Sequence, residues 1–332
     1  MSQRAAQAKK LIESGTPEVC LFAGCGTSYY LSIAAAAFFQ ELTGMPSRAV
    51  PASELILRPD SYLVKGRKAL LVAFSRSGET TETVVAAQFH RSRGSGPVIA
   101  VTCNDQDALG QEADLHIPIP GAGDRSVVMT SSFTSMLLAA ELLAALTADR
   151  REGAEALSRL PGLLRSQLEH QRSFGESLGR DASHQKFIFL GMAPFFGLAS
   201  EAMLKLKEMT QVPCEAYSPL EFRHGPISVA EPGTLAVLLG SDRGGRHELD
   251  VLRDVRSLGG RTMVVAGEVP DGAADLGYAV GSGLPDFVRG PLYMPLMQCL
   301  AYYRAMARGQ DPDRPQHLNR VVTLDAATLG RE

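Results

Sequence analysis

Short apolar runs alternate with longer helix-like stretches along most of this chain. Short apolar runs suit strands that are buried on both faces of a parallel sheet. The stretches between them are long enough for the helices that connect parallel strands. The alternation therefore predicts an α/β fold in which helices flank a mainly parallel sheet.

The predicted elements fall into two groups. The first half has expected strands at 19–25, 47–51, 69–75, 98–102 and 115–119, and helices at 28–42, 80–93 and 130–148. The second half has expected strands at 186–191, 235–239 and 263–266, and helices at 194–209 and 287–307. The charged stretch between the halves lacks strand signals and predicts a linker with a helix near 157–178.

Both halves open with a strand that ends in glycine and passes directly into a helix. The first reads Phe22-Ala23-Gly24-Cys25-Gly26-Thr27-Ser28, and the second reads Phe189-Leu190-Gly191-Met192-Ala193. We interpret this as a duplication, with a first domain at 1–150, a linker and helix at 151–184, and a second domain at 185–332. In open sheets of this class, ligands bind beyond the carboxyl ends of the strands.

Charge and hydropathy exclude several partners. The 33 basic and 36 acidic residues give a net charge of -3 without a block of like charges, so no broad attraction to nucleic acid or anionic lipid is expected. The longest apolar stretch, at 135–148, is interrupted by Glu141 and is shorter than the ~18 to 20 residues of a membrane span. We expect no nucleic-acid and no membrane partner.

The cysteines and the N-terminus indicate the compartment. The five cysteines form no C-x-x-C pair and are scattered, which argues against a disulfide framework or a zinc site and favours buried thiols. The N-terminal residues form no apolar signal-peptide core. We therefore expect a cytoplasmic protein that uses no metal and no other cofactor.

The first glycine-rich turn can hold an anion. Its glycines permit a tight strand-to-helix turn, and Thr27 and Ser28 offer hydroxyls beside the free amides of a helix start. The same pattern is also an ordinary capped turn, so this motif leaves both interpretations open.

A second turn shifts the balance towards an anion site. Ser75-Arg76-Ser77-Gly78-Glu79-Thr80 again follows a strand and precedes a helix, and it is rich in hydroxyls. It contains no lysine and lacks the spacing of a nucleotide P-loop, so a small phosphate monoester such as a sugar phosphate fits better than ATP. A third cluster, Thr130-Ser131-Ser132, fits either a binding role or plain helix capping.

Acid–base groups are concentrated in the second half. Glu201, Lys205 and Glu208 are spaced to share one face of a helix, while Lys207 points elsewhere. The alternative interpretation is a solvated stripe with an ion pair. The segment Arg223-His224-Gly225-Pro226 follows, where glycine and proline hold a loop with an imidazole that suits proton transfer near neutral pH.

Together these motifs resemble the SIS (sugar isomerase) domain family over nearly the whole chain. The two hydroxyl-rich turns, the segment from Glu201 to Glu208 and the histidine loop are similar to the isomerase part of glucosamine-6-phosphate synthase. The segments 127–136, 218–226 and 319–322 resemble the tagatose-6-phosphate ketose/aldose isomerase or galactosamine-6-phosphate deaminase group. The resemblance implies two tandem flavodoxin-like domains, each with a mainly parallel five-stranded sheet flanked by helices.

The resemblance also implies a sugar-phosphate site and assigns roles to its residues. Glu208 is the base that moves a proton between C1 and C2, Lys205 and Glu201 lie beside it, and His224 opens the sugar ring from the neighbouring subunit of a homodimer. Because both subunits contribute, the active sites lie at the dimer interface. The implied substrate-binding residues are Gly26, Thr27, Ser28, Ser75, Arg76, Ser77, Thr80, Val127, His317 and Arg320.

Two departures from the synthase shape the expected reaction. The sequence has no counterpart of the N-terminal glutaminase domain, so we expect isomerisation alone or a deamination that releases ammonia by hydrolysis. Where the synthase has a lysine that binds the open-chain sugar as a Schiff base, this sequence has Arg320. A guanidinium stays protonated and cannot act as that amine, so His317 or Arg320 is expected to contact hydroxyls or the phosphate instead.

The expected function is an isomerase or deaminase for a hexose or amino-hexose 6-phosphate, such as galactosamine-6-phosphate or glucosamine-6-phosphate. Three alternatives stay open at this point. They are a phosphosugar isomerase without nitrogen chemistry, an enzyme that acts on glycated amino-acid phosphates, and a sugar-phosphate sensor without catalysis. A sensor would not need both Glu208 and His224, and no additional helix-turn-helix segment or basic arm is evident.

Overall fold

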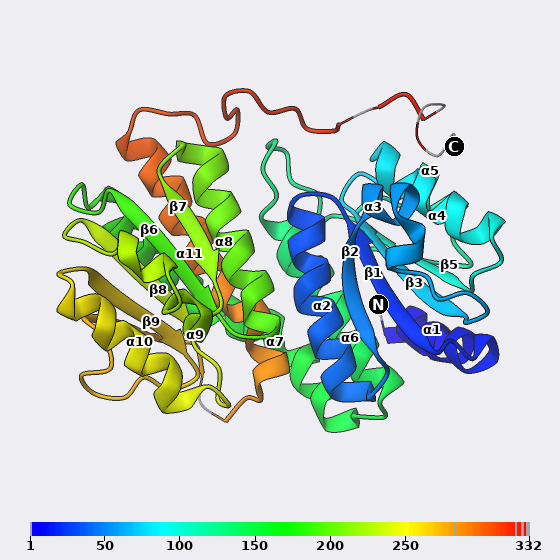
Figure 1. Ribbon diagram of the computed structural model, residues 1–332, viewed down its shortest axis with the longest axis horizontal. Helices are drawn as coiled ribbons and strands as arrows, with labels where there is room; N and C mark the ends of the chain where they lie inside the picture. The colour runs from blue at the N-terminus through cyan, green and yellow to red at the C-terminus, as the bar shows by residue number, and fades with distance from the viewer. Residues whose placement is uncertain (1, 282, 323, 327–328, 330–332) are drawn as a thin grey trace. The chain divides into compact units, whose positions relative to one another are not determined.

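The computed structural model describes residues 2–281, 283–322, 324–326 and 329 (Figure 1). The chain divides into two compact units. The first contains the residues before Ser126, the segment Met129–Leu157 and the tail from Asn319 onward. The second contains Ser126–Val128 and Ser158–Leu318.

The first unit is built on a five-stranded sheet in which every pair of neighbouring strands is parallel. Its strand order is β2-β1-β3-β4-β5, which is the order of flavodoxin-like folds. The strands are β1 (Val19–Gly24), β2 (Ser47–Pro51), β3 (Ala69–Ser75), β4 (Val98–Thr102) and β5 (Leu115–Pro118).

Two groups of helices cover the first sheet (Figure 1). One group packs together on one face and consists of α1 (Ser2–Gly15), α2 (Thr27–Thr43) and α6 (Ser131–Thr147). The other contains α3 (Ala52–Leu57), α4 (Thr81–Ser92) and α5 (Ala108–Gln111), with the short 3-10 helix η1 (Pro59–Ser61) beside α3. Because both faces are covered, strand β3 is buried at every residue, as its uninterrupted apolar run indicates.

The second unit repeats this topology. Its sheet has the order β10-β9-β8-β6-β7, again with parallel neighbours, which is the flavodoxin-like order within this half of the chain. The strands are β6 (Lys186–Gly191), β7 (Cys214–Tyr217), β8 (Thr234–Leu239), β9 (Arg261–Ala266) and β10 (Leu276–Ala279).

Helices also flank the second sheet. α8 (Pro194–Thr210) packs on β6 and β7 and against α11 (Asp286–Ala307), which in turn meets α7 (Arg151–Arg180). α10 (Gly245–Ser257) packs on β8 and β9 and against α9 (Pro219–Phe222), which the 3-10 helix η2 (Pro226–Val229) follows. The expected fold class, two parallel five-stranded sheets flanked by helices, is confirmed.

The structure differs from the sequence-based expectations at the boundary between the units. The segment expected to be a linker plus a helix is one continuous helix, α7, and the boundary between the units falls inside it, after Leu157. The tail from Asn319 groups with the first unit rather than with the second, because its backbone is hydrogen-bonded to side chains at the end of β3 and the start of α4. These contacts join residues that are distant in the sequence.

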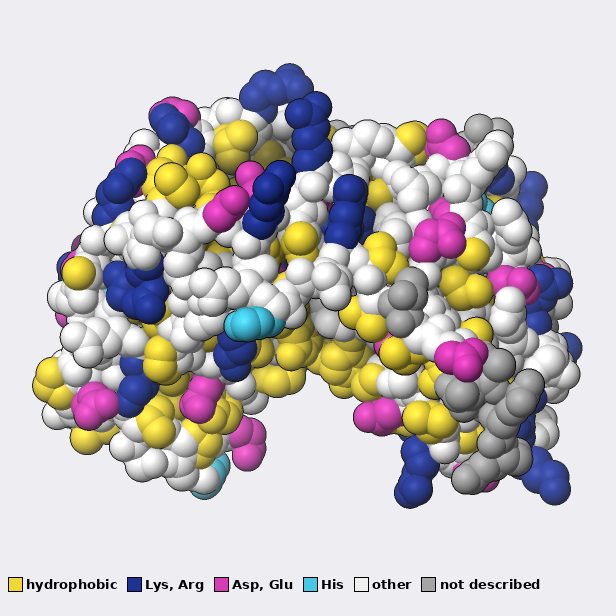
Figure 2. All heavy atoms as spheres, turned by 90° about the horizontal axis from the view of Figure 1, so that it is seen from above, with side chains coloured by type: hydrophobic (Ala, Val, Ile, Leu, Met, Phe, Trp, Pro, Cys, Tyr) yellow, Lys and Arg dark blue, Asp and Glu magenta, His cyan; other side chains and the backbone are white. Residues whose placement is uncertain are grey.

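The sequence-based expectations omit β7, β10 and α10, which the structure contains. The edge strands β7 and β10 are short and partly polar, so they carry little periodicity. The helix α10 did have a signal, since its buried residues Val251, Leu252 and Val255 follow helical spacing. In the part of the chain that the structure describes, no helix has the length and apolarity that crossing a membrane requires. On the face drawn in Figure 2, basic and acidic side chains are interspersed in both units.

Candidate functional site

The predicted phosphate turns of the first unit lie at the switch point of its sheet. Strands β1 and β3 are hydrogen-bonded neighbours, and the chain leaves β1 towards β2 on one side before returning to β3 on the other. The turns after these two strands therefore lie at the same edge of the sheet, where such folds bind ligands. Cys25 Sγ in the first turn lies 3.7 Å from Thr83 Oγ1, just beyond the second.

The turn after β1 requires glycine for two reasons. A Cβ on Gly24 would lie 2.6 Å from the backbone carbon of Ser28, so the chain could not turn so tightly with any larger residue. Gly26 has a φ of 54°, which glycine adopts without strain. The turn buries Thr27 and Ser28 at the N-terminus of α2, where backbone amides and the helix dipole favour an anion.

The turn after β3 is held by its own hydroxyls. Ser75 Oγ accepts the Gly78 N–H at 3.0 Å and lies 3.2 Å from Thr80 Oγ1, and Ser77 Oγ accepts the Glu79 N–H at 3.1 Å. These short-range bonds curl the segment into a loop that is lined with hydroxyls at the start of α4. Arg76 is buried beside them, so a fixed positive charge also belongs to this turn.

The C-terminal tail supplies a second arginine to the same region of the first unit. The Arg76 guanidinium donates to the backbone carbonyl of Arg320 at 3.0 Å, and the Arg320 guanidinium donates to the Asp124 carbonyl at 2.7 Å. The Leu324 N–H donates to Thr81 Oγ1 at 3.1 Å. Two predicted site residues, Arg76 and Arg320, are thereby brought together.

The hydroxyls of the third cluster do not cap α6 themselves, because its N-cap residue Thr130 makes no side-chain cap hydrogen bond. The Asp124 carboxylate accepts hydrogen bonds from the backbone amides and hydroxyls of Thr130, Ser131 and Ser132 at the start of α6. Burial alone would raise the pKa of Asp124, but these hydrogen bonds outweigh it and lower the pKa. An internal carboxylate thus occupies this helix start, a role for Asp124 that the sequence analysis had missed.

The charged face of α8 is confirmed in the second unit. Lys205 Nζ lies 3.3 Å from Glu201 Oε1 and 2.6 Å from Glu208 Oε2. The side chains of Lys205 and Glu201 are fully buried, whereas 21% of the Glu208 side chain is exposed. Lys207, one residue before Glu208, is exposed. The solvated-stripe interpretation is wrong, because solvation does not hold two fully buried charges.

This arrangement suits proton transfer. A buried ammonium is costly unless carboxylates neutralise it, and Glu201 and Glu208 do so from both sides. The exposed part of Glu208 leaves one carboxylate accessible as a proton acceptor, and the buried Lys205 holds that carboxylate in place.

The other predicted residues lie on loops. His224 is exposed between α9 and η2, next to Gly225, whose φ of 123° shapes the turn. Neighbouring Arg223 is anchored by an ion pair with Asp254 at 2.6 Å. Val127 donates its N–H to the Asp313 carbonyl within the second unit, and His317 is exposed with a φ of 64°. No metal-binding group of three or more His, Cys, Asp or Glu side chains occurs among the described residues.

The protein is thus a tandem of two open α/β units, with hydroxyl-rich turns at the switch point of the first unit and a buried lysine–carboxylate cluster in the second. A comparison with known families matches residues 19–146 and 182–276 to the SIS domain. The match covers more than half of the chain, so the chain belongs to the SIS domain family.

Curated relatives share sequence over most of this chain. The isomerizing glutamine–fructose-6-phosphate aminotransferase of Pyrobaculum aerophilum is 31% identical over 310 residues, covering 91% of this chain and 51% of the relative. The enzyme of the same name from Pseudomonas aeruginosa is 30% identical, covering 97% of this chain and 56% of the relative. The chain thus spans about half the length of these curated relatives.

Two solved structures are similar over more than nine-tenths of their length. Glucosamine-6-phosphate deaminase from Thermotoga maritima has a TM-score of 0.78 and 28% identity, covering 97% of this chain and 98% of that one. Tagatose-6-phosphate ketose/aldose isomerase from Escherichia coli has a TM-score of 0.76 and 24% identity, covering 94% and 92%. The latter similarity concerns the fold alone.

Proposed function

We propose that the protein is an aldose–ketose isomerase or deaminase for an amino-hexose 6-phosphate, such as glucosamine-6-phosphate or galactosamine-6-phosphate. The observation that carries this proposal is Lys205, buried between Glu201 and Glu208 on α8. A deaminase is favoured because the similarity to the Thermotoga maritima deaminase extends over both chains almost completely.

The first unit would hold the phosphate. The backbone and hydroxyls of the two turns, at Gly26, Thr27, Ser28, Ser75, Ser77 and Thr80, offer neutral donors, and Arg76 adds a charge-assisted one. A phosphate held in this way does not react, so it contributes binding energy that positions the sugar. Arg320, hydrogen-bonded beside Arg76, would contact the phosphate or a hydroxyl rather than form a Schiff base.

The acid–base chemistry would begin after His224 opens the sugar ring. Glu208 would take the proton from C2 of the open-chain amino-aldose while negative charge develops on the oxygen at C1, and the buried Lys205 would hold the Glu208 carboxylate in place. Return of the proton to C1 leaves an imine at C2, and water hydrolyses it to a ketone and ammonia. Glu201 would hold Lys205 in place, because its carboxylate pairs with the buried ammonium.

We further propose a cytoplasmic homodimer whose active sites lie at the interface, with His224 supplied by the neighbouring subunit. The exposure of His224 and the ion pair that anchors its loop suit a residue that acts on another chain. Val127 and His317 would contact the sugar. The five free cysteines suit a reducing compartment such as the cytoplasm.

The proposal is tested with a panel of hexose and 2-amino-hexose 6-phosphates, each assayed for ketose formation and for ammonia release. A deaminase forms both products in equal amounts from an amino sugar. Ketose from a hexose phosphate without ammonia from any amino sugar would assign the protein as an isomerase without nitrogen chemistry. Binding without turnover of any of these sugars would contradict catalysis of this kind and favour a sensor. A glycated amino-acid phosphate is assayed beside the panel, and turnover of that compound alone would favour an enzyme that acts on glycated amino-acid phosphates.

A further inference from the structure

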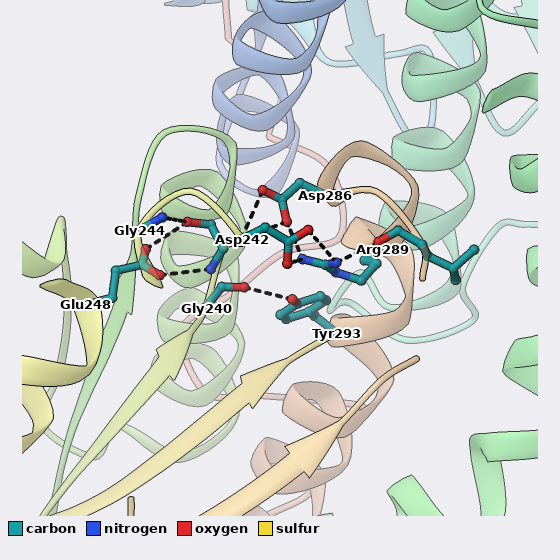
Figure 3. A network of polar contacts seen from close by, with 9 residues as sticks. Gly240, Asp242, Gly244, Glu248, Asp286, Arg289 and Tyr293 are labelled. Carbon is teal, nitrogen blue, oxygen red and sulfur yellow. Dashed lines mark hydrogen bonds and ion pairs between the residues drawn. The ribbon is translucent and has the colours of Figure 1, made fainter. Parts of the chain in front are cut away.

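The second unit has a switch point equivalent to the proposed phosphate site. It lies where β6 and β8 end side by side, because these strands are the counterparts of β1 and β3 in the repeated topology. The segments that follow them are 191–195 and 240–248. Figure 3 shows that charged and aromatic side chains converge at this edge of the second sheet.

The turn after β6 keeps the backbone of its counterpart but has lost its hydroxyls. A Cβ on Gly191 would lie 2.2 Å from the Phe195 carbonyl oxygen, just as Gly24 is pressed against Ser28. Ala193 has a φ of 50° and a ψ of -116°, close to the 54° and -124° of Gly26. Pro194 and Phe195 then stand where the first unit has Thr27 and Ser28.

These replacements remove the donors that an anion needs. Proline has neither an N–H nor a hydroxyl, and phenylalanine offers only an apolar ring. The Phe195 ring is fully buried and lies 5.1 Å from the ring of Tyr293, whose hydroxyl donates to the Gly240 carbonyl at 2.8 Å (Figure 3). Aromatic rings therefore fill this part of the crevice.

The turn after β8 keeps its serine but provides its own carboxylate. Ser241 Oγ accepts the Gly244 N–H at 2.9 Å, as Ser75 Oγ accepts the Gly78 N–H in the first unit. The Glu248 carboxylate then accepts the Ser241 N–H at 2.9 Å and the Ser241 hydroxyl at 3.2 Å (Figure 3). A Cβ on Gly244 would lie 2.0 Å from Glu248 Cδ, so this glycine makes room for the carboxyl group.

The Arg289 side chain fills the remaining space at the carboxyl ends of β8 and β9. Its side chain is 3% exposed and donates to both carboxylate oxygens of Asp242, at 2.9 and 2.7 Å, as well as to the Leu284 carbonyl and to Asp286. Gly267, directly after β9, lacks a Cβ that would lie 2.7 Å from Arg289 Nη1. The buried guanidinium of Arg289 is thus already neutralised by two carboxylates, whereas Arg243 of the same turn is exposed to solvent.

We infer that the switch point of the second unit is a closed copy of the phosphate site, in which Glu248 occupies the anion position and Arg289 and the aromatic rings fill the crevice. The comparison rests on the proposed phosphate site of the first unit. Sugar phosphate would then bind at the switch point of the first unit only. The switch point of the second unit would have a structural role, as part of the packed interior of the unit that carries Glu201, Lys205 and Glu208.

The raised pKa of Glu248 also indicates that the switch point of the second unit does not bind an anion. Burial raises the pKa of Glu248 to about 7, although the hydrogen bonds from Ser241 oppose this shift. The position therefore disfavours even one negative charge. A phosphate dianion would face the same burial and would also lie near Asp242 and Asp286, which opposes its displacing Glu248, although the exposed Arg243 offsets part of this repulsion.

The decisive experiment uses the matched serines of the two copies. Ser75→Ala should raise the Kd for glucosamine-6-phosphate about 10- to 100-fold, because a charged acceptor loses a donor. Ser241→Ala should leave the Kd and a stoichiometry of one per chain unchanged in isothermal titration calorimetry. Weakening by Ser241→Ala to a similar extent, or two sugars bound per wild-type chain, would overturn the inference. If neither serine affects binding, the second copy is closed and the proposed phosphate site fails instead.

A second measurement follows the titration of Glu248 in the wild-type protein. In protein labelled with ¹³C at glutamate Cδ, the Glu248 resonance is assigned by its loss in Glu248→Gln. Its titration midpoint should stay near 7 with and without saturating glucosamine-6-phosphate. A fall towards 4.5, the ordinary pKa of a solvated glutamate, on sugar binding would mean that the ligand displaces the carboxyl group and that the copy is open.

Discussion

Glu208 combines a close contact with Lys205 and partial exposure, and this combination makes its substitution informative. Glu208→Gln keeps the shape of the side chain but cannot accept the substrate proton. We expect kcat to fall about 10²- to 10⁴-fold, the usual effect of losing a general base, while sugar-phosphate binding survives. Steady-state kinetics with calorimetric binding checks this expectation.

Lys207 provides the matched control on the same helix. It is exposed and has no part in the Lys205 cluster, so Lys207→Gln removes a charge beside Glu208 without touching the proposed chemistry. Its kcat should stay within about twofold of the wild type. Normal turnover in Glu208→Gln would show that Glu208 is structural and would make Glu201 the candidate base.

Glu141 is a residue-scale feature with a predictable pH dependence. It is fully buried in α6, and neither carboxyl oxygen has a hydrogen-bond partner among the described residues. Burial raises the pKa of this group well above its ordinary value. The unfolded chain therefore releases the proton at a lower pH than the folded protein does, and this group makes stability fall as pH rises above ~4.5.

Substitution of Glu141 should remove this penalty. Glu141→Met should gain stability relative to the wild type as pH rises, by up to about 1.4 kcal/mol per pH unit until the folded protein also ionises. Urea unfolding at pH 5, 6, 7 and 8 measures the difference, and Glu141→Gln should show the same slope because it also lacks the titrating group. Stability curves that run parallel for variant and wild type would contradict a buried neutral Glu141.

At the scale of elements, the close approach of α7 and α11 depends on glycine. A Cβ on Gly179 would lie 2.7 Å from both the Arg304 nitrogen and the Leu300 oxygen, which are backbone atoms that cannot move without shifting α11. Gly179→Ala should therefore destabilise the protein by about 1 to 3 kcal/mol through overpacking. Thermal and urea unfolding provide the measurement.

Gly162 on the same helix is the natural control. No atom lies within 4 Å of its added Cβ among the described residues, so Gly162→Ala should stabilise the protein by up to about 1 kcal/mol through helix propensity alone. Opposite signs for the two substitutions would establish the contact as the cause. Two stabilising substitutions would mean that α7 and α11 do not pack so closely.

At the scale of the whole molecule, the proposed dimer predicts complementation. Glu208→Gln and His224→Ala should each be inactive alone. In a hybrid dimer with shared sites, one site collects both defects and the other has neither, so activity returns to about half of the wild-type value per dimer. Co-expression with two different affinity tags yields the hybrid for assay.

The opposite arrangement has a distinct outcome. If Glu208 and His224 of one chain serve the same site, every site of the hybrid keeps one defect. A purified hybrid that is no more active than its parents, alongside an active wild-type dimer carrying the same two tags, would therefore reject shared sites.

Local patterns in the sequence were sufficient to predict the central strands, the charged face of α8 and the two glycine-containing turns of the first unit. Apolar runs placed the central strands within a residue or two, because strands covered on both faces must be apolar throughout. Helical spacing put Glu201, Lys205 and Glu208 on one face, since three and four residues make about one turn. Glycines next to hydroxyls located both turns of the first unit, because steric limits on a tight turn are local.

Tertiary structure decided which of these polar groups are available for a ligand. The cluster at Thr130 and the turn at Ser241 look as suitable as Ser75 in sequence, yet Asp124 and Glu248 occupy them. Arg320 reaches Arg76 from the other end of the chain. Such pairings depend on where distant segments meet in the folded chain, and burial then determines whether a charge is neutralised, protonated or left for a substrate, which no local pattern encodes.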